Sequence, residues 1–117
     1  MEINNKYALV TGGNSGIGKS IAIELAQRGF NLLLVAQNKN RLTDTQLEIC
    51  ESYNVNVKII SCDLSQHVKR IEVFNYCVEK KLNINVLINN SGYGLWGYFH
   101  QLTLENQFEM MRLNMDE

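Results

Sequence analysis

An apolar run that leads directly into a glycine-rich turn constrains this chain more than any other stretch. Residues 7–10 read Tyr-Ala-Leu-Val and predict a strand, and the turn that follows has glycines at positions 12, 16 and 18. The next segment, 15–28, predicts a helix, because Ile17, Ile21 and Leu25 recur every four residues and share one face. Gly29 is placed to end that helix. The stretch therefore predicts a strand, a tight turn and a helix in direct succession.

This order of elements is suited to binding phosphate. Glycines remove Cβ atoms, so backbone N–H groups can approach an anion, and the helix N-terminus adds a partial positive charge. The other interpretation is a tight turn that needs glycine only for its backbone angles. Three glycines between a strand and a helix favour a dinucleotide site over that alternative.

The rest of the chain alternates between strand and helix patterns. Further strands are predicted at 31–36, 55–61 and 84–88, and further helices at 41–53, from Ser65, and from Thr103. Alternation of this kind predicts parallel strands joined by right-handed crossovers. We therefore expect one α/β domain over residues 1–117, a Rossmann-type doubly wound parallel sheet of four strands in the order 3-2-1-4 with helices on both faces.

Three further expectations follow from the same patterns. The inner face of the third helix is predicted to carry Val68, Ile71, Phe74, Val78 and Leu82. The last helix is predicted to turn Phe108, Met111 and Met115 inward. The fourth strand would then have a bare outer edge, which favours pairing with another chain, so a homo-oligomer is expected.

The composition excludes several classes of function. A formal net charge of −1 gives no basic face for nucleic acid, and no apolar run has the length of a membrane span. The three cysteines have no C-x-x-C spacing, and His67 and His100 stand alone, so neither a disulfide framework nor a metal site is expected. No signal-type segment opens the chain, and a cytoplasmic domain is expected.

Four motifs in order resemble those of the short-chain dehydrogenase/reductase family. They are Thr11-Gly12-x-x-x-Gly16-x-Gly18, then Asp63-Leu64 after the third strand, Asn89-Asn90-Ser91-Gly92 after the fourth, and Asn114. Ser91 stands where the family usually has Ala. In open α/β sheets, ligands bind where neighbouring strands have connections on opposite faces, and the first and third of these motifs would meet there.

The resemblance implies an NAD(P)-dependent oxidoreductase that interconverts a carbonyl and an alcohol by hydride transfer. The family's catalytic Ser and Tyr-x-x-x-Lys follow the position of Asn114, whereas the sequence ends at Glu117. We therefore expect the N-terminal half of such an enzyme, without activity alone; the alternative is a non-catalytic dinucleotide-binding or association module. Tyr76 and Lys80 have the Tyr-x-x-x-Lys spacing, but they precede Asn114 and are predicted to lie on a solvated face of the third helix.

The resemblance also implies the site. Asn114 is expected to be catalytic, through a water in the family's proton relay, and no residue is expected to bind a metal. The cofactor-binding residues are expected to be Gly12, Asn14, Ser15, Gly16, Ile17, Gly18, Gln37, Asn38, Arg41, Asp63, Leu64, Asn90, Ser91 and Gly92. NADP is favoured over NAD, because no carboxylate follows the second strand to bind the ribose 2′-hydroxyl, while Lys39 and Arg41 could attract a 2′-phosphate. These two cations could also be ordinary surface charges.

Overall fold

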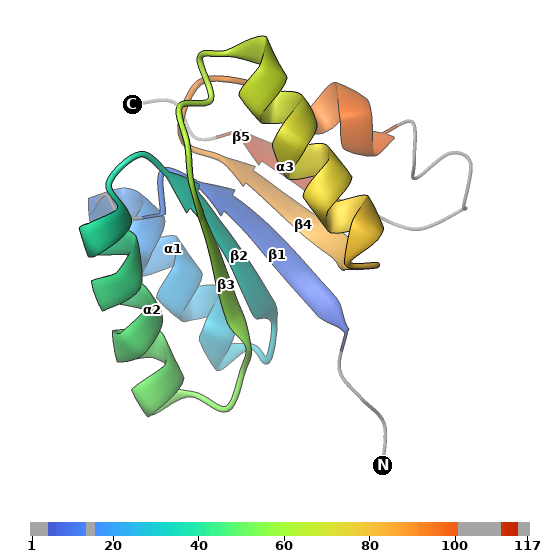
Figure 1. Cartoon of the computed structure of the whole chain (residues 1–117). Helices are drawn as coiled ribbons and strands as arrows, with labels where there is room; N and C mark the ends of the chain where they lie inside the picture. Colours follow the sequence, from blue (N-terminus) through green and yellow to red (C-terminus); the bar gives the residue numbers. More distant parts are fainter. Residues whose placement is uncertain (1–4, 14–15, 101–110, 115–117) are drawn as a thin grey trace.

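The computed structural model describes residues 5–13, 16–100 and 111–114, and its centre is a twisted parallel sheet (Figure 1). Five strands form it: β1 (Lys6–Thr11), β2 (Asn31–Ala36), β3 (Val57–Ser61), β4 (Asn83–Asn89) and β5 (Met111–Asn114). Their spatial order is β3-β2-β1-β4-β5, and every neighbouring pair is parallel. The predicted doubly wound α/β sheet of order 3-2-1-4 is confirmed, with one short strand added.

Helices cover both faces of the sheet. Helices α1 (Gly16–Gln27) and α2 (Lys39–Ser52) lie on one face, and α3 (His67–Glu79) lies on the other with a helical segment at 96–100 (Figure 1). The strands alternate between two cores: Leu33 packs on the α3 side, whereas Leu32 packs on the side of α1 and α2. A strand covered on both faces needs apolar residues at consecutive positions, which explains the uninterrupted run of β2.

The inner face of α1 is made of small residues. Gly18, Ala22 and Ala26 are buried, whereas Ile17 is 52% exposed, so the predicted stripe through Ile17 was shifted by one residue. The reason is close packing, because a Cβ atom at Gly18 would collide with the carbonyl oxygen of Gly12. A larger side chain on this face would push α1 away from the turn that precedes it.

The predicted stripe of α3 was also partly wrong. Val73 and Cys77 are its buried residues, whereas Val68 and Val78 are exposed. Ser65 was expected to be the N-cap, but the helix begins at His67 with Gln66 as its N-cap, and the Ser65 hydroxyl bonds to the Asp63 carboxylate.

The segment that contains Asn114 is a strand where a helix was predicted. Met111–Asn114 forms β5 and pairs with Val86–Asn89, so the outer edge of β4 is partly covered and not bare. The alternation Met-Arg-Leu-Asn fits the two-residue period of a strand, and so short a segment cannot be separated from a helix by periodicity. Thr103, Phe108 and Met115 lie outside the described residues.

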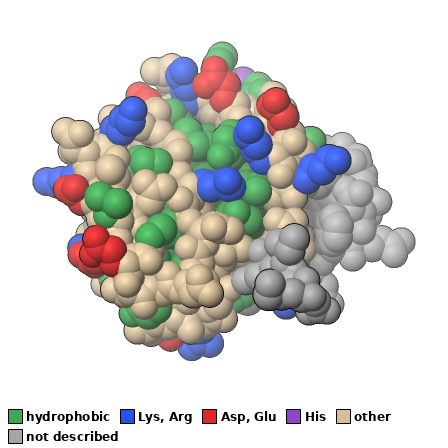
Figure 2. Space-filling view, turned by 60° about the horizontal axis from the view of Figure 1, so that its bottom comes forward, with side chains coloured by type: hydrophobic (Ala, Val, Ile, Leu, Met, Phe, Trp, Pro, Cys, Tyr) green, Lys and Arg blue, Asp and Glu red, His purple; other side chains and the backbone are tan. Residues whose placement is uncertain are grey.

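The two ends of the sheet differ. The end at which the strands begin is turned forward in Figure 2, where hydrophobic side chains gather in the middle of the face among Lys and Arg. The opposite end, where the strands finish, carries the polar residues described next. Across the part of the chain that the structure describes, no helix combines the length and the hydropathy needed to cross a membrane.

Candidate functional site

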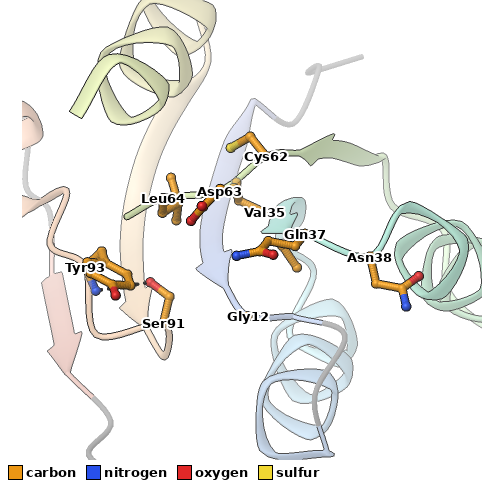
Figure 3. Close-up of a pocket in the computed structure, with 10 residues that line it drawn as sticks. Gly12, Val35, Gln37, Asn38, Cys62, Asp63, Leu64, Ser91 and Tyr93 are labelled. Atoms are coloured by element: carbon orange, nitrogen blue, oxygen red, sulfur yellow. Dashed lines mark hydrogen bonds between the residues drawn. The ribbon is translucent and has the colours of Figure 1, made fainter. Parts of the chain in front are cut away.

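A pocket of about 270 Å³ lies at the carboxyl ends of the central strands (Figure 3). It is lined by Gly12, Val35, Ala36, Gln37, Asn38, Cys62, Asp63, Leu64, Ser91 and Tyr93. These residues follow or end β1, β2, β3 and β4, which are far apart in the sequence. The pocket therefore lies at the topological switch point between β1 and β4, where ligands of doubly wound sheets bind.

Thr11, the last residue of β1, holds two of these strand ends together. Its buried Oγ1 accepts hydrogen bonds from the backbone N–H groups of Asn90 at 2.9 Å and Ser91 at 3.1 Å. The same hydroxyl is within donating distance of Asn89 Oδ1, at 3.2 Å, and of the Ile88 carbonyl, at 3.3 Å. One proton and two lone pairs are thus all used. Sequence reasoning quoted Thr11 in the glycine motif but gave it no role.

The glycines of the turn have different roles. Gly12 has φ +70°, which favours glycine, and its N–H donates to the Val35 carbonyl at 2.7 Å. A Cβ at Gly16 would meet no described atom within 4 Å, so the start of α1 is open at this point. The first N–H groups of a helix lack intrahelical partners and can bind an anion. Asn14 and Ser15 were expected beside them but lie outside the described residues.

On the β2 side, Gln37 and Asn38, which were predicted to bind the cofactor, line the pocket. Asn38 is also the N-cap of α2, because its Oδ1 accepts the backbone N–H of Arg41 at 3.0 Å. Lys39 and Arg41 are exposed in the first turn of α2, and neither takes part in the ion pairs formed among the described residues. Arg41 does not itself line the pocket, but it lies on the helix that begins there.

On the β3 side, Asp63 and Leu64, which were predicted to bind the cofactor, both line the pocket. The Asp63 carboxylate accepts the Ser65 hydroxyl at 2.7 Å and the Ser65 N–H at 3.0 Å. These two bonds, with smaller help from the side chains of Gln66 and Gln37, lower the pKa of Asp63 below its ordinary value. Leu64 is buried against the core on the α3 side. The loop thus presents an ionised acceptor beside an apolar surface.

On the β4 side, Asn90 is buried beneath the glycine turn, and Ser91 lines the pocket. A Cβ at Gly12 would lie 3.3 Å from Asn90 Nδ2, so the two turns are in close contact. Gly92 has φ +83°, and Tyr93 follows it into the pocket wall. Tyr93 was not among the residues that the sequence predicted for the site, because it lies just after the third of the four motifs.

The predicted catalytic residue has a different setting from the one expected. Asn114 is the last residue of β5 and not part of a helix, and its backbone pairs with that of Asn89 in β4. This pairing lies at the same end of the sheet as the pocket. Among the described residues, no group of three or more His, Cys, Asp or Glu side chains could hold a metal ion.

The Tyr76 and Lys80 pair lies away from the pocket. Tyr76 is close to Tyr7, and burial and the proximity of Tyr76 together raise the pKa of Tyr7. Tyr7 lies near the beginning of β1, at the end of the sheet opposite the pocket. Tyr76 is half-buried against the core and not solvated as predicted, whereas Lys80 is exposed. Neither residue lines the pocket, so the spacing is not a catalytic pair at this site.

Comparison with known proteins identifies relatives of this chain. A family model described as short chain dehydrogenase matches residues 6–116. The very-long-chain 3-oxoacyl-CoA reductase of Kluyveromyces lactis is 41% identical over 86 residues, which are 74% of this chain and 25% of that protein. The 3-ketodihydrosphingosine reductase of Bos taurus is 37% identical over 113 residues, 92% of this chain and 34% of that protein. The chain thus spans about a quarter to a third of the length of these relatives.

Solved structures show the same architecture. The L-sorbose reductase of Gluconobacter frateurii, complexed with NADPH and L-sorbose, is 31% identical with a TM-score of 0.71, over 80% of this chain and 36% of that one. An alcohol dehydrogenase of Thermococcus sibiricus, complexed with 5-hydroxy-NADP, is also 31% identical, with a TM-score of 0.70 over 74% of this chain and 37% of that one.

Proposed function

The chain belongs to the short-chain dehydrogenase family, and on that premise we propose that it is the cofactor-binding part of an NADP(H)-dependent oxidoreductase that interconverts a carbonyl and an alcohol. The single observation that carries the proposal is the pocket at the β1–β4 switch point, lined by the ends of four strands. The Thr11 hydroxyl fixes two of these ends against each other.

Each side of the pocket suits one part of a dinucleotide. The open start of α1 at Gly16 would receive the diphosphate, because its backbone N–H groups and the helix dipole favour an anion. The Asp63 carboxylate would accept a hydrogen bond from the adenine amino group, and Leu64 would pack beside the ring. A bound nicotinamide would supply the hydride, and this chain's residues would bind and orient the cofactor.

The β2 side supports NADP as the cofactor. Gln37 and Asn38 provide no carboxylate to bind the ribose 2′-hydroxyl or to repel a 2′-phosphate. Lys39 and Arg41 are exposed at the N-terminus of α2, where their charges add to the helix dipole. The NADPH complex of the L-sorbose reductase relative is consistent with this preference.

Calorimetric titration of the 117-residue protein with NADP⁺ and NAD⁺ tests the binding proposal. We expect saturable binding of NADP⁺, weakened by about tenfold or more in Gly16→Val, because a side chain there would occupy the space for the diphosphate. Gly97→Val is the control, because a Cβ at Gly97 also meets no described atom within 4 Å, but that residue lies in the segment at 96–100. Failure of the unsubstituted protein to bind either nucleotide would overturn the proposal.

Arg41→Ala tests the choice of cofactor. We expect the substitution to weaken NADP⁺ binding by about tenfold, since it removes a charge-assisted contact, and to leave NAD⁺ binding unchanged. Lys80→Ala, at the far end of α3, removes an equal charge and should change neither affinity. An equal loss for both nucleotides in Arg41→Ala would contradict recognition of the 2′-phosphate.

An activity assay tests whether this polypeptide supplies catalytic groups of its own. The sequence contains no candidate Ser and Tyr-x-x-x-Lys after Asn114, so we expect the 117-residue polypeptide to bind NADPH without oxidising it in the presence of ketones. NADPH oxidation at tenfold above the background rate or more would show that the chain supplies its own acid and base.

A further inference from the structure

The turn after β4 has a hydroxyl at its centre. Ser91 Oγ accepts the backbone N–H of Tyr93 at 3.3 Å and lies 3.3 Å from Asn89 Oδ1, to which it can donate (Figure 3 shows the bond to Tyr93). Gly92, at φ +83°, reverses the chain between the two residues. The Ser91 side chain therefore fixes the position at which Tyr93 leaves the turn.

These bonds continue into the buried part of the sheet. Asn89 Oδ1 also accepts from the Thr11 hydroxyl at 3.2 Å, and Asn89 is 3% exposed. Tyr93 is thus connected through Ser91 and Asn89 to the residue that joins β1 to β4. These bonds hold the backbone of Tyr93, so the ring leaves the turn from a fixed point, and less conformational entropy is lost when a ligand binds.

Tyr93 itself is only half covered. Tyr93 lines the pocket and is 48% exposed, so much of its ring surface is open to a ligand in the pocket. In Figure 3 it lies on the β4 side of Gly12, whereas Gln37 and Asn38 lie on the β2 side. The apolar side chain of Leu64 lines the same pocket from the loop after β3. A flat heterocycle bound between these walls would cover the exposed ring.

We propose that Tyr93 forms an aromatic wall against the adenosine half of the bound dinucleotide, and that Ser91 is the positioning residue that holds it there. The proposal rests on the proposed function and adds to it a contact outside the four family-like motifs. An alanine at position 91 would keep the backbone turn but would remove the hydroxyl that both accepts from Tyr93 and donates to Asn89.

Calorimetry with two ligands tests the wall: NADP⁺, and 2′,5′-ADP, which carries the adenosine half only. We expect Tyr93→Ala to weaken both ligands by about tenfold, because the contact between base and ring is lost. Tyr93→Phe keeps the ring and should keep the affinity for both. Wild-type affinity in Tyr93→Ala, or a loss for NADP⁺ alone, would overturn the assignment to the adenosine half.

A double-mutant cycle tests the role of Ser91. We expect Ser91→Ala to weaken both ligands by about threefold to tenfold, and to have no further effect in the Tyr93→Ala background, because Ser91 acts through that ring. Ser52→Ala, at the exposed end of α2, is the matched control. Additive losses in the cycle would show that Ser91 acts independently and would overturn its positioning role.

The two proposals fail in different ways. Absence of NADP⁺ binding by the unsubstituted protein would remove the proposed function. Normal NADP⁺ binding that neither Tyr93→Ala nor Ser91→Ala changes would leave that function standing and remove this inference alone.

Discussion

The hydroxyl of Thr11 accepts the backbone N–H of Asn90 at 2.9 Å, across 79 positions of sequence. Thr11 ends β1 and Asn90 directly follows β4, so one side chain fixes the separation of the two turns that line the pocket. Both residues are buried, and neither lines the pocket. The shape of the site therefore depends on a hydrogen bond behind its surface.

Thr11→Val should destabilise the fold. Valine keeps the shape but removes the acceptor for two backbone N–H groups, at Asn90 and Ser91, and leaving such groups unpaired costs about 1–3 kcal/mol. Urea unfolding at neutral pH would measure the loss. Thr11→Ser retains the hydroxyl and should lose only about 1 kcal/mol, for the buried methyl group. Equal stability of Thr11→Val and the wild type would show that the bonds contribute nothing.

Alanine at two glycines in the first turn of α1 should have different effects on stability. Gly18→Ala should destabilise by about 1–3 kcal/mol, because the new Cβ would collide with the carbonyl oxygen of Gly12. Gly16→Ala should leave stability near the wild-type value, because its Cβ would meet no described atom within 4 Å. Thermal unfolding of both variants checks the contrast, and a Gly16→Ala variant as unstable as Gly18→Ala would contradict it.

Asp63 should make stability depend on pH on the acid side. Its pKa is lower in the folded protein than in the unfolded chain, so the unfolded state binds more protons between the two values. The contribution is complete above the ordinary pKa of about 3.9 and is lost as the pH falls through the folded value. Asp63→Asn should flatten this slope in urea titrations at a series of acidic pH values. A slope in Asp63→Asn equal to that of the wild type would contradict this role of the carboxylate.

The three thiols should react with an alkylating reagent at different rates. Burial raises the pKa of Cys77 to about 12, and burial also raises the pKa of Cys62, so both hold less reactive thiolate at pH 8 than an exposed cysteine. Cys50 is exposed and should react first. Cys62 lines the pocket, so saturating NADP⁺ should slow its labelling but not that of Cys50, as followed by peptide mass spectrometry. Equal protection of both thiols would argue against binding in this pocket.

The central part of the fold could be read from local patterns. A strand covered on both faces must be apolar at consecutive positions, and β2 occupies the predicted residues 31–36. Besides Gly12, five of the residues that were predicted to bind the cofactor line the pocket: Gln37, Asn38, Asp63, Leu64 and Ser91. Each of them directly follows a strand or lies within three residues of its end, and the ends of parallel strands gather at one edge of a sheet.

Other features could not be read in this way, because they depend on what lies across the sheet. The inward face of α1 is set by the close approach of Gly18 to Gly12, which selects small residues over the larger Ile17. Met111–Asn114 is a strand because β4 offers an unpaired edge beside it, and its four residues carry too short a pattern to show this alone.

The sequence by itself determined the parallel sheet, the glycine turn and the edge at which polar residues would collect, because these follow from periodicity and from backbone constraints between near neighbours. Only the tertiary structure decided that Thr11 joins the two strand ends and that Tyr93 enters the pocket wall. The bonds of Thr11 join residues 77 to 80 positions apart, and such pairings are specified by packing of the whole sheet.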